Sequence, residues 1–183
     1  MIALDTNLIV YAHRPDTPFH AAAARVLEQL AESPYPWAIP WPCVHEFLSV
    51  VTGPAFGKAA TPLAVALEAI RQIVVHPRCV TLAETEGHFE LLAALCQRAN
   101  LRGGAIHDAR IAALCISHGV EELWSCDRDF QRFPDVRVRN PLIPSVHEPL
   151  LDTTSAYSPT AVPHRARQRA IPIQTSQAAH RRR

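Results

Sequence analysis

Long apolar runs are absent from this sequence. No stretch approaches the ~18 consecutive apolar residues that span a bilayer, although 48% of the 183 residues are hydrophobic. The first residues also lack the basic region and apolar core of a secretory signal. We therefore expect a soluble, cytoplasmic protein with no membrane association, whose length suits a single domain around one hydrophobic core.

Cysteine is scarce and shows no pairing pattern. The five cysteines are odd in number and widely spaced, and none forms the Cys-x-x-Cys spacing of a zinc site. This arrangement also argues against a disulfide framework. We expect small buried side chains at all five positions: Cys43, Cys79, Cys96, Cys115 and Cys126.

An excess of positive charge is lacking as well, since the formal net charge is +1. Residues 1–143 carry 12 Lys and Arg against 15 Asp and Glu, a net charge of −3, whereas residues 144–183 carry six arginines against two acids. The 144–183 segment is rich in proline and polar residues and buries too little apolar surface to offset its chain entropy. We predict a folded domain at 1–143 and a disordered tail at 144–183, and overall charge does not indicate nucleic-acid binding.

Short apolar segments alternate with helical patterns along residues 1–143. Strands are predicted at 2–4, 37–39, 80–82, 122–126 and 136–138, and helices at 8–13, 19–30, 43–51, 61–74, 86–99 and 106–118. Thr17 and Pro18 are predicted to begin the second helix as cap and first-turn proline. The alternation is typical of an α/β fold with about five parallel strands and helices on both faces. In such folds the active site lies outside the carboxyl ends of the strands.

Acidic residues occupy the positions at which this fold places active sites. Asp5 follows the first predicted strand, and Asp127 follows the fourth, with Asp129 two residues later. Glu46 and Asp108 fall in predicted first helical turns, where the helix dipole favours a carboxylate. Converging carboxylates suit Mg²⁺ or Mn²⁺ rather than zinc. The chemistry that such a site supports best is metal-assisted phosphodiester hydrolysis.

Each acid also has an ordinary structural alternative. Asp5 is suited to cap the helix that follows it, and first-turn acids need no further role. Asp127 and Asp129 suit a solvated turn in which one of them pairs with Arg128 or Arg132. Independent roles of this kind would not predict four acids at one edge of the sheet, so we favour a joint metal site, with Asp127 rather than Asp129 as the direct ligand.

Several histidine, arginine and tryptophan residues near the acids in sequence are further candidates for catalysis or binding. His45 and His107 each precede an acid, but adjacent helical residues point about 100° apart, so we interpret both as structural or as supports beside the metal-binding acids. Arg110 is predicted to anchor either an RNA phosphate or a nearby acid. Core packing is favoured over base stacking for the tryptophans, because all three lie in or beside strands: Trp37, Trp41 and Trp124.

Four ordered motifs resemble those of PIN-domain ribonucleases. They are Asp5-Thr6-Asn7, the Glu46 helix, the segment from Gly104 to Ala113, and Ser125-Cys126-Asp127-Arg128-Asp129-Phe130. More narrowly, the segment from Trp37 to Phe47 and the closing Arg139-Asn140-Pro141-Leu142 resemble the VapC toxins of bacterial type II toxin–antitoxin modules. The resemblance covers residues 1–143.

This resemblance implies a PIN-like (Rossmann-like) fold and a Mg²⁺- or Mn²⁺-dependent endoribonuclease. It also implies a homodimer neutralised by a VapB-like antitoxin whose tail enters the acidic site. Position by position, it implies catalytic and metal-binding roles for four acids: Asp5, Glu46, Asp108 and Asp127. Asp129 matches an acidic position that often accompanies them, and Thr6 and Ser125 match polar positions beside them.

The sequence departs from the family pattern at the tail and at Cys126, where a small residue without a thiol is more usual. The tail is open to three interpretations: added RNA affinity, another partner, or no role. Rival functions are a non-toxin nuclease acting in RNA processing or on structured DNA, a small phosphatase, and a catalytically silent PIN-like nucleic-acid-binding module. A phosphatase with an aspartyl nucleophile requires a second Asp where this chain has Asn7, and the four retained acids argue against a silent module.

Overall fold

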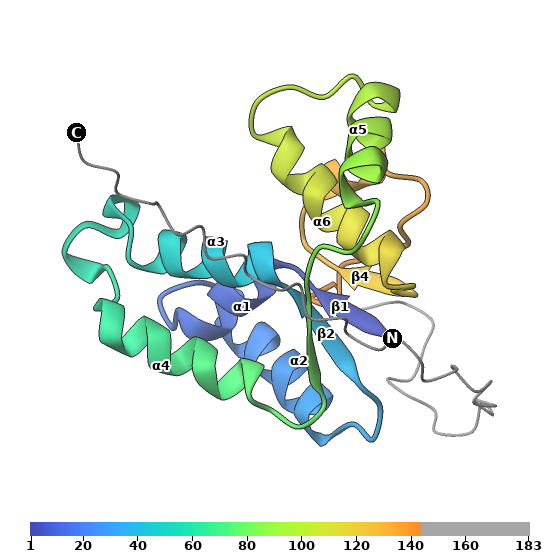
Figure 1. Cartoon of the computed structure of the whole chain (residues 1–183). Coiled ribbons are helices and arrows are strands. Elements are labelled where there is room, and N and C mark those ends of the chain that lie inside the picture. Colours follow the sequence, from blue (N-terminus) through green and yellow to red (C-terminus); the bar gives the residue numbers. More distant parts are fainter. Residues whose placement is uncertain (144–183) are drawn as a thin grey trace, which may run out of the picture. The chain divides into compact units, whose positions relative to one another are not determined.

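A parallel five-stranded sheet organises the protein (Figure 1). The computed structural model describes residues 1–143, and the predicted tail lies outside them. The strand order is β3-β2-β1-β4-β5, and every pairing is parallel. The strands are β1 (Ile2–Leu4), β2 (Trp37–Pro40), β3 (Cys79–Leu82), β4 (Glu122–Trp124) and β5 (Val138–Arg139). The prediction of about five parallel strands is confirmed.

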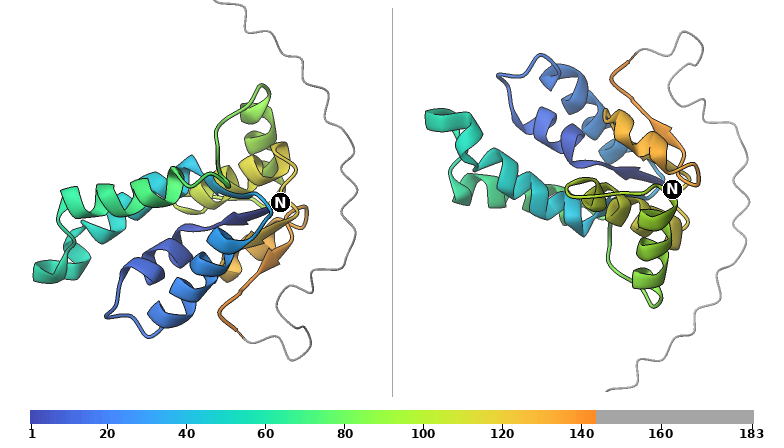
Figure 2. Two further views of the ribbon diagram at one scale, coloured as in Figure 1. Left: turned by 90° about the horizontal axis from the view of Figure 1, so that it is seen from below. Right: turned by 90° about the horizontal axis from the view of Figure 1, so that it is seen from above.

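Six α-helices connect and cover the strands. They are α1 (Thr6–His13), α2 (His20–Glu32), α3 (Trp41–Val51), α4 (Leu63–Val74), α5 (His88–Arg98) and α6 (Ala105–Ser117). Two short 3₁₀ helices, η1 (Pro54–Ala59) and η2 (Arg128–Arg132), were not predicted. The pairs α1–α2 and α5–α6 lie on opposite sides of β1 (Figure 2), which confirms the helices predicted on both faces. Within residues 1–143, no helix has the length and apolar character needed to span a bilayer.

Helix α3 begins two residues earlier than predicted. Pro42 occupies its first turn, where the missing proline N–H leaves no intrahelical hydrogen bond unmade. The proline therefore starts the helix instead of delaying it. Because α3 begins at Trp41, no acid lies in its first turn, and the helix-dipole argument for Glu46 is wrong.

The predicted start of α2 is also wrong. The helix begins at His20 after Phe19, and no side chain caps it. The Thr17 hydroxyl instead donates to the Arg14 carbonyl at 3.0 Å, closing the turn that follows α1. Thr side chains can make local hydrogen bonds of this kind to the backbone in place of a helix cap.

Strand β4 ends at Trp124, short of the predicted Cys126. The Cys126 N–H donates to the side-chain oxygen of Asn7 at 3.1 Å, so the chain leaves the ladder at this point. Strand β5 lies at Val138–Arg139 and not at 136–138, because the Val136 N–H closes a turn onto the Phe133 carbonyl.

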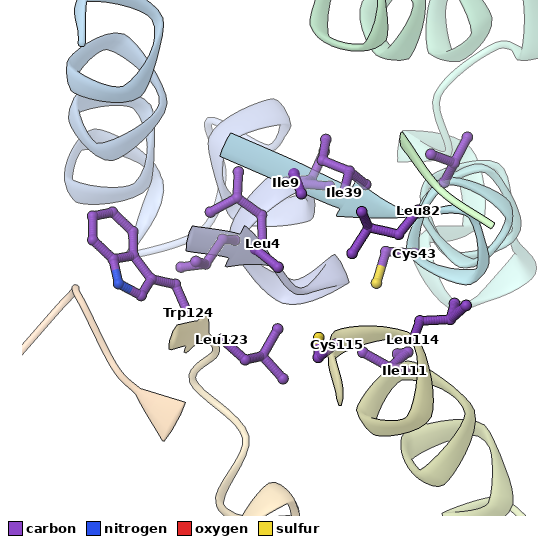
Figure 3. Close-up of a cluster of buried hydrophobic side chains, with 14 of the residues drawn as sticks. Leu4, Ile9, Ile39, Cys43, Leu82, Ile111, Leu114, Cys115, Leu123 and Trp124 are labelled. Atoms are coloured by element: carbon purple, nitrogen blue, oxygen red, sulfur yellow. The ribbon is translucent and has the colours of Figure 1, made fainter. Parts of the chain in front are cut away.

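The hydrophobic core lies on both sides of the strands. Leu4, Ile39 and Leu123 come from three neighbouring strands, and Ile111 and Leu114 come from α6 (Figure 3). All five cysteines are free, which agrees with the expected absence of a disulfide framework within the described residues. Only Cys43 and Cys115 are fully buried, so the prediction of buried side chains is wrong for Cys79, Cys96 and Cys126, which are partly buried. In the ladder Leu4 lies opposite Trp124. The residues that follow these two strands, Asp5 and Ser125, therefore leave the sheet at the same edge, and this is the edge that carries the acids.

Candidate active site

Asp5 and Ser125 stand side by side at the carboxyl ends of β1 and β4. The parallel register places them there, and the Asp5 N–H extends the ladder by donating to the Trp124 carbonyl at 3.0 Å. The Ser125 hydroxyl then donates to Asp5 Oδ2 at 2.6 Å. Two residues that are 120 positions apart in sequence are therefore in direct contact.

The Asp5 carboxylate is almost completely buried, with 5% of the residue exposed. Its Oδ1 accepts the Thr6 N–H at 2.7 Å, which caps helix α1. Its Oδ2 accepts the Asn7 amide at 2.5 Å in addition to the Ser125 hydroxyl. The capping role considered for Asp5 is real, and it coexists with a position at the centre of the acidic edge.

Asn7 ties the two strand ends together. Its amide nitrogen donates to the Ser125 Oγ at 3.0 Å, and its Oδ1 accepts the Cys126 N–H. The Ser125 Oγ in turn accepts the Asp127 N–H at 2.9 Å. Sequence reasoning quoted Asn7 within the first motif but did not select it as a site residue. The sequence feature that could have identified Asn7 is its place in Asp5-Thr6-Asn7, three residues beyond the end of β1.

Helix α3 contacts this group through two side chains. Glu46 is solvent-exposed, yet its Oε2 accepts the Thr6 hydroxyl at 2.6 Å. The buried Cys43 thiol lies 3.9 Å from Asp5 Oδ1, and burial raises its pKa, so the thiol stays protonated. The first residues of α1 therefore link Asp5 to Glu46.

The remaining acids come from α6 and from the loop after β4. Asp108 lies in the first turn of α6, as predicted, and is half-buried. Asp127 caps η2 by accepting the Asp129 N–H at 2.8 Å. Asp129 pairs with Arg132 at 2.9 Å, and both acids are exposed. The solvated-turn alternative therefore describes the two acids, and Asp127 in addition lies beside Ser125 through its backbone N–H.

The acids affect one another electrostatically. The pKa of Asp5 is raised to about 6, chiefly by burial and also by the negative charges of Glu46 and Asp127, although the hydrogen bonds from Ser125 and Thr6 lower it. Burial likewise raises the pKa of Asp108 to about 6, with contributions from Asp127, Asp129 and Glu46. The structure therefore brings all five predicted acids within electrostatic reach at one edge of the sheet.

The donor chemistry of this cluster fits a hard divalent cation. Among the described residues, no three Asp, Glu, His or Cys side chains already form a group that holds an ion. However, Mg²⁺ takes only one or two carboxylates directly and completes its octahedron with water and phosphate oxygens. Two carboxyl groups whose pKa is raised by burial and by like charge are stabilised as anions by a bound cation.

The neighbouring residues divide into three groups. Arg110 donates to Glu84 through two nitrogens, at 3.0 and 2.7 Å, so it anchors a nearby acid, which is one of its two predicted roles. Trp37 and Trp124 are buried in the core, as predicted. The prediction is wrong for Trp41, which is 38% exposed and stacks on His45.

Comparison with known proteins places these features in a family. The PIN domain family matches residues 2–136. The ribonuclease VapC48 of Mycobacterium tuberculosis is 31% identical over 137 residues, which is 75% of this chain and 94% of that protein.

Solved structures agree on the fold. The toxin VapC20 of M. tuberculosis, which cleaves the sarcin–ricin loop, has a TM-score of 0.58 at 21% identity and covers 76% of this chain and 100% of its own. VapBC2 of Rickettsia felis, bound to a DNA fragment from its promoter, has a TM-score of 0.55 at 21% identity and covers 76% of this chain and 98% of its own. The chain with this acidic sheet edge belongs to the PIN-domain family, among the VapC ribonucleases.

Proposed function

We propose that this protein is the toxin of a type II toxin–antitoxin pair, an endoribonuclease that hydrolyses RNA phosphodiester bonds with Mg²⁺ or Mn²⁺. The observation that carries the proposal is the cluster of acids at one sheet edge in a member of the VapC ribonucleases. The acids assigned to metal binding and catalysis are Asp5, Glu46, Asp108 and Asp127.

The chain's own residues divide the work at this edge. Asp5, Glu46, Asp108 and Asp127 would hold the cation, directly or through its water ligands, and the bound cation would neutralise charge at the phosphoryl group and make a nucleophilic water more acidic. Glu46 and Asp127, which are exposed at this edge, would also orient the attacking water and accept its proton. Attack by water on phosphorus with departure of the 3′ oxygen, which takes up a proton, would leave 5′-phosphate and 3′-hydroxyl ends.

Three polar side chains hold these acids in place. Ser125 and Asn7 fix Asp5 from the β4 side and from α1, and Thr6 fixes Glu46. Partners of this kind keep ligands in a productive geometry before an ion arrives. The arrangement lowers the reorganisation needed on metal binding.

The test compares cleavage of cellular RNA by the wild-type protein and by Asp5→Asn, with Mg²⁺, with Mn²⁺ and with EDTA. We expect discrete, metal-dependent products that disappear in the variant, because Asn keeps the volume of Asp and removes its charge. Glu68→Gln is the matched control, since Glu68 is an exposed acid on α4. Full activity of Asp5→Asn would contradict the proposed metal site.

We also propose a VapB-like antitoxin as the partner. The acidic edge and the net charge of −3 over residues 1–143 suit a basic tail that enters the site. An apolar cavity of about 360 Å³ between α1, α2 and α4 offers an anchor for the same partner. Trp37 and Phe47 are among the residues that line it, so an apolar side chain of the partner is the complement.

The homodimer implied by the resemblance remains a prediction. Sedimentation of the purified protein tests it, and inhibition of cleavage by the product of the neighbouring reading frame tests the antitoxin. A cleaving enzyme that no adjacent gene product inhibits would favour the non-toxin nuclease.

A further inference from the structure

Trp41 differs from the other two tryptophans in being open to solvent. It is 38% exposed, whereas Trp37 and Trp124 are 2% and 6% exposed. It is the first residue of α3 and directly follows β2, so it stands at the edge of the sheet from which the acids project. A single exposed apolar residue is common on protein surfaces and needs no explanation. A binding role for Trp41 therefore depends on which side chain lies beside it.

His45 extends Trp41 into a larger aromatic surface. The two rings stack with centroids 6.0 Å apart and an angle of 27° between their planes. Their spacing of four residues places them on one face of α3, and His45 is also exposed. We call this exposed pair the Trp41–His45 platform.

The platform flanks the acidic edge. Cys43, two residues after Trp41, lies 3.9 Å from Asp5 Oδ1. Glu46, the residue after His45, accepts the Thr6 hydroxyl. Adjacent helical side chains point about 100° apart, so the platform occupies the outer face of α3 next to Glu46 without entering the metal site.

We propose that the Trp41–His45 platform stacks an unpaired base of the RNA substrate beside the acidic site. This inference rests on the proposed ribonuclease function and adds a residue pair that determines substrate affinity. Proteins hold single-stranded RNA by stacking its bases on aromatic rings, histidine included. A platform at this place positions a nucleotide flanking the scissile phosphate.

The net charge of residues 1–143 favours stacking of RNA bases over contacts to the RNA phosphate backbone at the Trp41–His45 platform. Residues 1–143 carry a net charge of −3, and the site itself is acidic, so little affinity is available from phosphate neutralisation. Two of the arginines near the acids, Arg110 and Arg132, are already paired with Glu84 and Asp129, and a third, Arg128, stands between two acids in the sequence. Stacking supplies affinity without requiring positive charge.

The first experiment measures cleavage of a short single-stranded RNA by Trp41→Ala and Trp41→Phe. For Trp41→Ala we expect KM to rise between about fivefold and a hundredfold, as for loss of a stacked base, with kcat unchanged. Trp41→Phe keeps a ring and should retain most of the affinity. Tyr35→Ala is the matched control, because Tyr35 is 47% exposed and precedes β2 at the opposite edge of the sheet.

The second experiment measures binding without cleavage, by tryptophan fluorescence of Asp5→Asn titrated with the same RNA. We expect saturable quenching that disappears in Asp5→Asn/Trp41→Phe, because the two remaining tryptophans are buried. This measurement tests the inference separately from the proposed function, because it shows whether RNA binds at the Trp41–His45 platform even if the wild-type protein cleaves no RNA.

Three results would overturn the platform. An unchanged KM in Trp41→Ala is one, and quenching that persists in the double variant is another. The third is a change in the sedimentation of Trp41→Ala from that of the wild-type protein, which would assign the exposed face to a protein contact.

Discussion

At the scale of single residues, Asp5 combines roles that conflict in the absence of a cation. It caps α1 and joins β1 to β4, and both roles require a buried carboxylate. Burial disfavours the charged form, which raises the pKa to about 6. Asp5, which contacts several other residues of the site, therefore destabilises the fold until a cation binds. Function and stability oppose each other at this position.

The raised pKa of Asp5 has a definite consequence for stability. The folded protein binds a proton more tightly than the unfolded chain, whose Asp has its ordinary pKa of 3.8. Stability without metal therefore falls as the pH rises from about 4 to about 6. Between pH 5 and pH 7.5 the loss attributable to Asp5 is about 1 kcal/mol.

Urea denaturation in EDTA at pH 5 and at pH 7.5 measures this loss. We expect Asp5→Asn to show a smaller difference between the two pH values than the wild-type protein, because its side chain does not titrate. Adding Mg²⁺ at pH 7.5 should stabilise the wild-type protein and have less effect on the variant. An equal pH difference in the two proteins would contradict the assignment.

At the scale of elements, Arg14 shows how a loop is tied to a helix. It follows α1 directly and is only 5% exposed. Its guanidinium pairs with Asp16 at 2.7 Å, donates to the Ala59 carbonyl at 2.6 Å and lies 4.0 Å from the Phe56 ring centre. These contacts join η1 to the helix that carries Asn7. Its partners in η1, Phe56 and Ala59, lie more than 40 positions away in sequence, so no local sequence pattern indicated this role of Arg14.

Replacing Arg14 by Met should lower the free energy of unfolding by about 2 kcal/mol, because the Ala59 carbonyl loses its charged donor and the stacking on Phe56 is lost. RNA cleavage measured well below the melting temperature should change little, because Arg14 does not contact the acids of the candidate active site. Urea denaturation measures the loss, and Arg25→Met, at an exposed position of α2, is the control. A loss no larger than that of the control would show that the loop is held by other contacts.

At the scale of the whole molecule, the charge is divided between two segments. Residues 1–143 contain the sheet, the helices and every acid of the site, and they are net negative, while residues 144–183 contribute a net charge of +4. Residues 1–143, which are those that the structure describes, contain a hydrophobic core of their own. The sequence prediction of a folded domain at 1–143 therefore leads to a simple experiment.

A chain that ends at residue 143 should unfold at the same temperature as the full chain and cleave RNA with the same kcat. The reason is that the core and the acids are retained. Calorimetry and cleavage at two salt concentrations test this expectation. A KM that becomes less salt-dependent on truncation would assign RNA affinity to the basic segment, and a large fall in melting temperature would contradict the domain boundary.

Local sequence pattern by itself determined the order of strands and helices, the parallel α/β class and the positions of the acids. Apolar runs and turn residues act over a few neighbours, so their effects are visible in the chain. The motif around Asp5 and the segment around Asp127 also identified the family, because the acids and their neighbours are adjacent in sequence.

Only the tertiary structure decided which of these residues touch. The register of β1 against β4 brings Ser125 onto Asp5, and Asn7 acquires its role by bridging the two strand ends. The exposure of Trp41 likewise depends on where α3 lies against the rest of the fold. Contacts between distant segments follow from packing the whole core at once, and no window of the sequence contains that information.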